Sequence, residues 1–218
     1  MRPHRAFASV ALLGVLLSGC ASPHPLAYEG LASASQLAPN PKDKDGHVPF
    51  SYSAADPNWP GYHAAIVDVV VYAGADQQFG GTTDADRAVL DAYMQKAFSE
   101  ALKSKYDLVS APNSGVLRIH LTLTGAQTST PILSTITKLA PAGAVLNSLQ
   151  TARDKEGAFS GSVSYAVEVY DSASDRLLLA YVAKQYPWAE DVTASFGPLD
   201  ASKAGIRSGA AALREQLH

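Results

Sequence analysis

The sequence is poor in the residues that most often carry cross-links, metals or charge-driven binding. Of its 218 residues only one is cysteine, so the chain cannot form an intramolecular disulfide or a multi-cysteine zinc or iron–sulfur site. Charged residues make up 17 %, and the formal net charge is −3. This balance gives no electrostatic reason to expect a nucleic-acid partner. The 47 % apolar content is that of a globular protein, and the length fits one domain with appendages.

Motifs for catalysis and metal binding are missing as well. No two of the six histidines have the three- or four-residue spacing of a metal-binding pair on a helix. The Ser160-Gly161 and Ser208-Gly209 pairs lack the Gly-x-Ser-x-Gly nucleophile elbow, and Gly80-Gly81 is not followed by the Lys-Ser/Thr of a phosphate loop. We therefore predict that the protein is not an enzyme and holds no metal or cofactor.

The N-terminus has the pattern of a signal peptide. Arg2 and Arg5 are followed by an apolar run at 6–17, which is shorter than the about 20 residues needed to cross a bilayer. The run ends at Leu17-Ser18-Gly19-Cys20, which resembles the bacterial lipobox. In that motif the thiol accepts a diacylglyceryl group, small residues admit the peptidase, and the new N-terminus is acylated too. An ordinary secretory signal with an inert cysteine is the alternative.

We favour the lipoprotein interpretation because it explains the only cysteine and its place at the end of the apolar run. It predicts a signal peptide at 1–19 and lipid attachment, including palmitate-type chains, at Cys20. Two or three acyl chains anchor stably, whereas a single chain is marginal. Ala21 is not the aspartate that retains such proteins in the inner membrane, which implies the outer membrane, with the protein facing the periplasm.

Residues 20–60 are rich in proline, alanine and serine and predict a tether. About thirty flexible residues would span roughly 30 Å. Phe50, Tyr52 and Trp59 indicate that the end of the tether is docked. Removal of Arg2 and Arg5 leaves the mature chain with 15 basic and 20 acidic residues, a net charge of −5, so lipid and not a basic face would hold it at the membrane.

Residues 61–218 predict a single α+β domain. We expect strands at 64–72, 106–110, 117–123, 163–169 and 176–186, and helices at 83–104 and 200–217, from their apolar periodicity. Thr83 is the expected N-cap of the first helix, and Asp200 or Ser202 that of the second. The order is β-α-β-β-insert-β-β-α. It predicts two layers, with both amphipathic helices on one face of a mostly antiparallel sheet.

Two groups of polar residues could carry chemistry. Arg118 and His120 lie on the polar side of an alternating strand, which is either a solvated face or an anion-binding face. Asp68, Glu168 and Asp171 could converge across neighbouring strands, as the carboxylates of a glycosidase do. We favour structural roles: a turn for Asp171, an outward position for Glu168, and an edge position or a loop hydrogen bond for Asp68.

The segment 131–149 is apolar but is interrupted by Lys138, Pro141 and Gly143. It predicts a flap of two short helical pieces over the sheet, or else a surface that packs against a partner or the membrane. The aromatic residues Tyr181, Tyr186 and Trp188 either extend that surface or belong to the core.

The lipobox, Phe50-Ser51-Tyr52, the strand 66–72, the strands within 114–124 and 161–171 and the C-terminal helix together resemble domain-of-unknown-function family 3313, a group of proteobacterial lipoproteins. The resemblance covers most of the mature chain and implies a fold more than an activity. We expect a non-enzymatic outer-membrane lipoprotein that binds or scaffolds an envelope protein. The alternative is a periplasmic binder of a small or lipidic ligand under the 131–149 flap.

Overall fold

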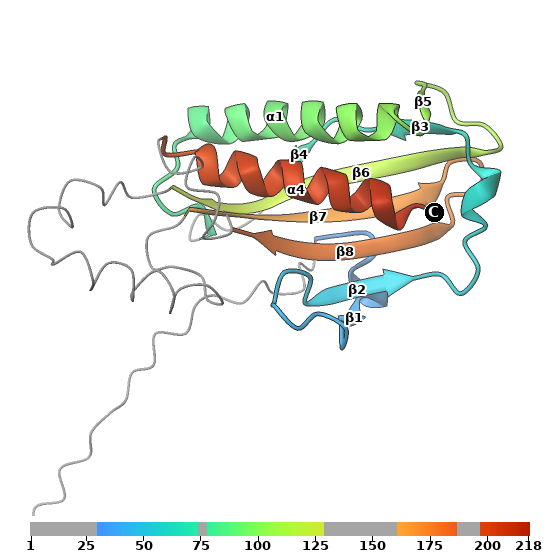
Figure 1. Cartoon of the computed structure of the whole chain (residues 1–218), viewed down its shortest axis with the longest axis horizontal. Helices are drawn as coiled ribbons and strands as arrows, with labels where there is room; N and C mark the ends of the chain where they lie inside the picture. The colour runs from blue at the N-terminus through green and yellow to red at the C-terminus, as the bar shows by residue number, and fades with distance from the viewer. Residues whose placement is uncertain (1–29, 74–77, 129–160, 187–196) are drawn as a thin grey trace, which may run out of the picture.

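The structure is a computed structural model that describes residues 30–73, 78–128, 161–186 and 197–218. Within these ranges the chain forms one eight-stranded sheet with two helices on one face, which confirms the predicted α+β class (Figure 1). The signal peptide, Cys20 and the segment 131–149 lie outside the described residues. None of the helices in the described ranges is long and apolar enough to cross a membrane.

The strands follow one another across the sheet in the order β1-β2-β8-β7-β6-β3-β5, and β4 pairs with β6 beyond the end of β3. The strand bounds are β1 Ala38–Pro39, β2 Phe50–Ser53, β3 Ala64–Val67, β4 Val71–Tyr72, β5 Asp107–Leu108, β6 Val116–Gln127, β7 Ser162–Asp171 and β8 Leu177–Gln185. β3 runs parallel to β5 and β6, because a helix crosses between them. β4 also runs parallel to β6, whereas the pairs from β6 through β7, β8 and β2 to β1 are antiparallel, so the sheet is mostly antiparallel as expected.

Helix α1 (Asp84–Lys103) begins at the predicted N-cap. Thr83 accepts a hydrogen bond from the Asp86 N–H, and the Asp86 carboxylate accepts one from the Thr83 N–H, which forms a capping box. Buried Leu90, Met94, Phe98 and Leu102 face the sheet. Val89 of the same helix lies outside this stripe and is 47 % exposed.

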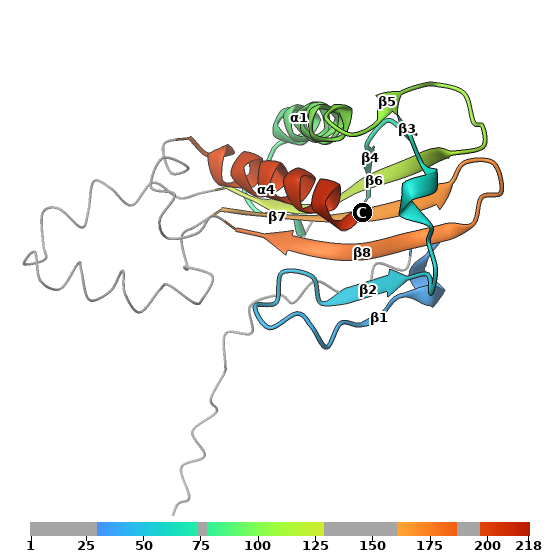
Figure 2. The same ribbon diagram turned by 45° about the vertical axis from the view of Figure 1, so that its right-hand side comes forward.

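Helix α4 (Asp200–Gln216) packs beside α1 over the same face (Figures 1 and 2). The predicted caps are wrong. The N-cap is Leu199 without a side-chain bond, and the Ser202 hydroxyl instead donates to the Ser162 carbonyl of β7. Ile206, Ala210, Leu213 and Leu217 are buried, as the periodicity predicts.

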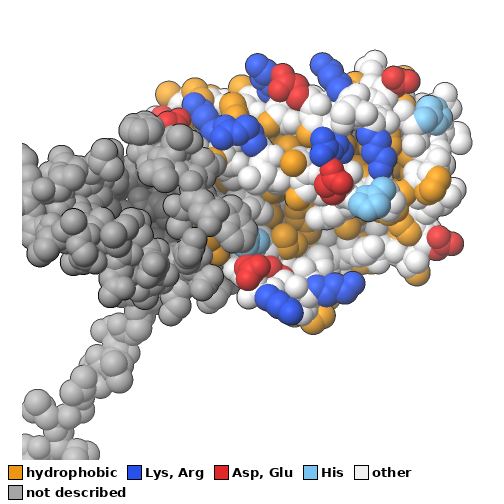
Figure 3. All heavy atoms as spheres, viewed as in Figure 1, with side chains coloured by type: hydrophobic (Ala, Val, Ile, Leu, Met, Phe, Trp, Pro, Cys, Tyr) orange, Lys and Arg blue, Asp and Glu red, His pale blue; other side chains and the backbone are white. Residues whose placement is uncertain are grey.

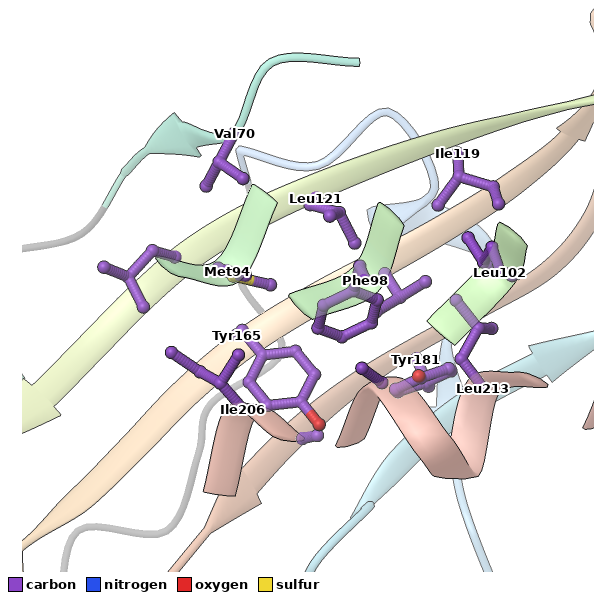
Figure 4. Packing of buried hydrophobic residues seen from close by; sticks show 14 of the residues in the cluster. Val70, Met94, Phe98, Leu102, Ile119, Leu121, Tyr165, Tyr181, Ile206 and Leu213 are labelled. Carbon is purple, nitrogen blue, oxygen red and sulfur yellow. The ribbon is translucent and has the colours of Figure 1, made fainter. Parts of the chain in front are cut away.

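The main core fills the space between the sheet and the helices (Figure 4). Phe98 of α1 meets Tyr165 of β7 edge to face, with ring centroids 5.9 Å apart. Gly209 of α4 lies against the Tyr165 hydroxyl, and a Cβ at that position would collide with it. Tyr181 is buried in this cluster, so of the two alternatives for it the core is correct.

The predicted strand 64–72 is interrupted after Val67. The side chain of Gln95 in α1 bridges the break: its Oε1 accepts from the Val70 N–H, at 3.0 Å, and its Nε2 donates to the Val67 carbonyl, at 3.3 Å. An amide side chain can replace one neighbour of a sheet ladder because it offers a donor and an acceptor together. The chain therefore changes course without leaving these two backbone groups unpaired.

The end of the predicted tether is docked, as its aromatic residues indicated. β2 pairs with β8, and β1 pairs with β2, so this segment extends the sheet. The docked part starts before Phe50. Leu31 is buried with Ala166 and Val182 on the face away from the helices, which we call the second face, and the 3-10 helix η1 (Ala34–Gln36) follows it.

This docking shortens the expected reach of the tether. Leu31 follows Cys20 by eleven positions, so the linking chain can extend at most about 40 Å, and about 20 Å as a random coil. The estimate from thirty flexible residues counted segments that are built into the sheet.

Candidate functional site

A group of polar side chains lies on the second face, where β3 ends and β6 and β7 run side by side. Arg118 is in register with Tyr170, and His120 with Glu168. Strand alternation turns these four side chains away from the helices, since the residues between them, such as Ile119 and Val169, belong to the core. Asp68 joins them from the residue directly after β3. We call these five residues the second-face cluster.

Asp68 is the acidic residue of the more exposed half of the second-face cluster. Its Oδ2 accepts from Arg118 Nε at 2.9 Å, and its Oδ1 from Arg118 Nη2 at 3.4 Å. His120 Nε2 lies 2.7 Å from Asp68 Oδ2, an ion pair whenever the imidazole is protonated. Asp68 lies directly after β3, and its partners are side chains of the neighbouring strand β6 and not the loop considered from the sequence.

Glu168 forms the buried half of the cluster. It lies on the predicted polar side of β7, but its expected exposure is wrong, since the residue is only 4 % exposed. The N-terminal segment covers it: the Ser33 N–H donates to Glu168 Oε1 at 2.7 Å, and the Tyr170 hydroxyl donates to the same oxygen at 3.1 Å. A buried carboxylate needs such donors. Glu168 therefore helps to tie the N-terminal segment to the sheet, together with the burial of Leu31 and the pairing of β2 with β8.

The electrostatics follow from these contacts. The hydrogen bonds and charge of Asp68 raise the pKa of Arg118 above its ordinary value, so this side chain stays a cation. Burial, and then the neighbouring Glu168 carboxylate, raise the pKa of Tyr170 far above 10, so its hydroxyl stays a donor. The His120 and Tyr170 rings are stacked obliquely, with centroids 5.0 Å apart. The cluster can thus hold a segment in place and present half-exposed polar groups beside it.

The three carboxylates considered for glycosidase chemistry have separate structural partners. Asp171 caps the β7–β8 turn as predicted, by accepting from the Ser174 N–H at 2.9 Å and hydroxyl at 2.7 Å. These bonds, the Ser174 hydroxyl first, lower the pKa of Asp171. The Tyr62 hydroxyl also donates to Asp171, and burial together with this carboxylate raises the pKa of Tyr62 to about 12.

No group of three metal-ligating side chains occurs in the described ranges. A shallow groove does lie between α1 and α4, with a cavity of about 240 Å³ lined by Tyr93, Lys96, Arg207 and Arg214 among others. Lysine and arginine side chains gather over the helices on this side (Figure 3). Arg207 donates to the Tyr93 hydroxyl, at 2.8 Å, and Lys96 lies 3.8 Å from Glu100, so these cations already have partners within the helix layer.

Sequence reasoning missed the covering of the second face. Ser164 and Glu168 gave β7 a one-sided pattern, which indicated a solvated side. The signal that could have corrected it is Ala166, a small apolar residue between them that is completely buried against Leu31. Tyr186, for which core or surface patch was open, stacks on His47 of the N-terminal segment with centroids 4.5 Å apart.

The sequence matches the family described as "Protein of unknown function (DUF3313)" over residues 27–213. A search of curated proteins gives no match. Among solved structures, the fold is similar to the PelC dodecamer subunit from Paraburkholderia phytofirmans, at 10 % identity, 71 % of this chain, 88 % of that chain and TM-score 0.37. A candidate lipoprotein from Caulobacter crescentus gives 10 %, 68 %, 87 % and 0.33 for the same measures. A DUF4136 family protein from Bacteroides thetaiotaomicron gives 8 %, 77 %, 94 % and 0.39.

Proposed function

This chain belongs to the DUF3313 family, and we propose that it is a lipid-anchored, non-enzymatic binding module on the periplasmic face of the outer membrane. The anchor is Cys20, at the end of the lipobox. The folded body would scaffold or bind an envelope protein. The carboxylates Asp68, Glu168 and Asp171 support a non-enzymatic role, because each is held by structural partners.

The observation that carries the proposal is the attachment of the N-terminal segment so soon after the anchor. Leu31 is buried on the second face, and the Ser33 N–H is bonded to buried Glu168. Eleven positions separate Leu31 from Cys20. A lipidated Cys20 would therefore keep the body within about 40 Å of the bilayer. Partners would be other proteins of the same envelope surface.

Lipidation is tested on the full chain expressed in its bacterial host. Mass spectrometry of the mature N-terminus should find residues 1–19 removed and a diacylglyceryl group plus an amide-linked acyl chain on Cys20. The Cys20→Ala variant should keep residues 1–19 and leave the outer-membrane fraction. An unmodified sulfur on wild-type protein recovered freely soluble from cells would overturn the anchor.

The binding role is tested by purification from cross-linked envelopes. Specific co-purifying proteins support scaffolding, whereas lipid retained by the isolated protein without a protein partner favours ligand binding instead. The Cys20→Ala variant is the matched control, because its folded domain is unchanged while its place in the envelope differs.

A further inference from the structure

Exposed large apolar side chains gather along one edge of the described sheet. Val69 is 81 % exposed and Val71 59 %, and Tyr72 is exposed beside them. Val109, also exposed, follows β5 at the same edge. Among the described strands β4 pairs only with β6, so its outer side carries no neighbour. We call residues 69–72 the open edge.

The backbone of the open edge is suited to accept another strand. The Ala73 N–H donates to the Leu123 carbonyl of β6, at 3.0 Å. Because N–H and C=O groups alternate in direction along a strand, those of Tyr72 turn away from β6. Soluble proteins usually protect such edges with proline, charge or a covering segment. An edge that instead carries exposed valines is typical of an interaction site.

A row of polar side chains on α1 runs along the open edge. Arg87, Asp91 and Gln95 are spaced four residues apart and so share one side of the helix. Arg87 donates to the Tyr72 hydroxyl, at 2.8 Å, and Gln95 bonds the backbone at Val67 and Val70. Asp91 therefore lies between two residues that contact this edge.

Among the described residues, one carboxylate oxygen of Asp91 has no hydrogen-bond partner at this edge. This oxygen, Oδ1, is buried. Burial alone raises the pKa of Asp91. A desolvated carboxylate oxygen without a donor is costly in the free protein. The Asp91 side chain as a whole is only half-buried, so a cation brought by a binding partner can still stabilise its charge.

We propose that the open edge binds an extended segment of a partner protein as an added strand, with apolar side chains over Val71 and a lysine or arginine against Asp91. Tyr72 is in register with Leu123, a core residue, and Val71 is in register with Thr122. The side chains of Val71 and Tyr72 therefore lie on opposite faces of the sheet. Tyr72 lies on the helix side, as Asp91 does, and Val71 on the second face. Alternating apolar and basic residues on the partner therefore fit the two sides.

A second copy of this chain fits less well. The open edge itself, residues 69–72, contains no lysine or arginine that a second copy could place against Asp91. At the opposite edge of the sheet, β1 contains Pro39, which has no N–H to donate. The open edge would be the surface through which the proposed binding module contacts its partner. Only the identity of that partner as an envelope protein rests on the proposed function.

The experiment uses the full-length lipidated protein in detergent and a fluorescent ten-residue peptide of alternating valine and lysine as the probe. A peptide of alternating valine and glutamate is its matched control. We expect the lysine peptide to bind at least about tenfold more tightly, as measured by fluorescence anisotropy. Val71→Lys should weaken binding about tenfold and Asp91→Asn about fivefold, whereas Ala38→Lys in β1 should leave it unchanged.

Peptides N-methylated at every residue test strand pairing itself and should lose binding, since they have no backbone N–H to donate to the edge. Equal binding of the lysine and glutamate peptides, or equal effects of Val71→Lys and Ala38→Lys, would overturn the proposal. A homodimer whose formation is abolished by Val71→Lys would overturn it in favour of self-association. An unmodified Cys20 would disprove the membrane anchor but would leave the peptide affinities unchanged. Failure of the proposed function and failure of the open-edge proposal can therefore be told apart.

Discussion

The two edges of the sheet are finished in opposite ways. At one edge, β1 is two residues long, contains Pro39 and continues into a segment that covers the second face. At the other, the open edge presents the exposed side chains of Val69 and Val71, and the nearby Asp91 Oδ1 has no hydrogen-bond donor among the described residues. The comparison shows that one sheet combines an edge closed by its own N-terminus with an edge left open. We infer that the domain is anchored through the closed edge and binds its partner through the open edge.

Both edges depend on one core, so the largest effect should come from the core itself. Phe98→Ala removes a fully buried ring that packs on Tyr165 and should lower the free energy of unfolding by about 3–5 kcal/mol. Denaturant unfolding measures the loss. Hydrogen exchange should accelerate at β2 and at β3 alike. Faster exchange at only one of them would mean that the edges belong to separate folding units.

Glu168→Ala should affect the closed edge selectively. It removes the acceptor of the Ser33 N–H, so we expect a loss of about 1–3 kcal/mol and faster hydrogen exchange over 33–53, with β3 unchanged. Glu168→Gln is the control, since its amide oxygen can still accept this bond and should lose less. Exchange in 33–53 that does not respond to the alanine variant would contradict the role given to Glu168.

Two adjacent valines separate the core from the open edge. Val70 is buried in the main cluster, and Val70→Ala should cost about 1–2 kcal/mol. Val71 is exposed, and Val71→Ala should cost less than about 0.5 kcal/mol. Chemical denaturation of both variants measures the difference. Equal losses would show that residues 69–72 are covered in solution.

The smallest expected effect has the opposite sign. Burial raises the pKa of Asp91, so the folded state binds its proton more tightly than the unfolded state, and this group lowers stability as pH rises through the raised pKa. Asp91→Asn lacks this ionisation and should melt slightly above the wild type. The difference in melting temperature should be larger at pH 8 than at pH 4. A difference that is the same at both pH values would remove the stated cause.

The sequence predicted the parts of this molecule that repeat. Alternation in β6 and β7 and the apolar stripes of both helices gave the fold class, and Thr83 gave the start of α1. It could not predict the covering of the second face, because Leu31 meets Ala166, and Ser33 meets Glu168, across more than 130 positions without any local signal. The same holds for Gln95, whose bridge across the broken strand depends on how α1 lies over the sheet.

The sequence predicted most residues of the candidate site but not how their side chains are arranged. Arg118, His120, Asp68 and Glu168 were all singled out, and the structure brings them together through strand register. Their roles were not readable, since Asp68 takes its partners from the neighbouring strand and Glu168 from the N-terminus. The open edge was missed because exposed valines in a strand look the same in sequence as buried ones.

Photo-cross-linking in intact cells tests the contrast between the edges most directly. A photoreactive phenylalanine analogue is placed at Val71 in one full-length variant and at Ala38 in another, and adducts are identified by mass spectrometry. We expect an adduct between position 71 and an extended, lysine- or arginine-containing segment of another envelope protein, reduced in yield by Asp91→Asn, and none at position 38. Adducts at position 38 alone, or the same adducts at both positions, would contradict it.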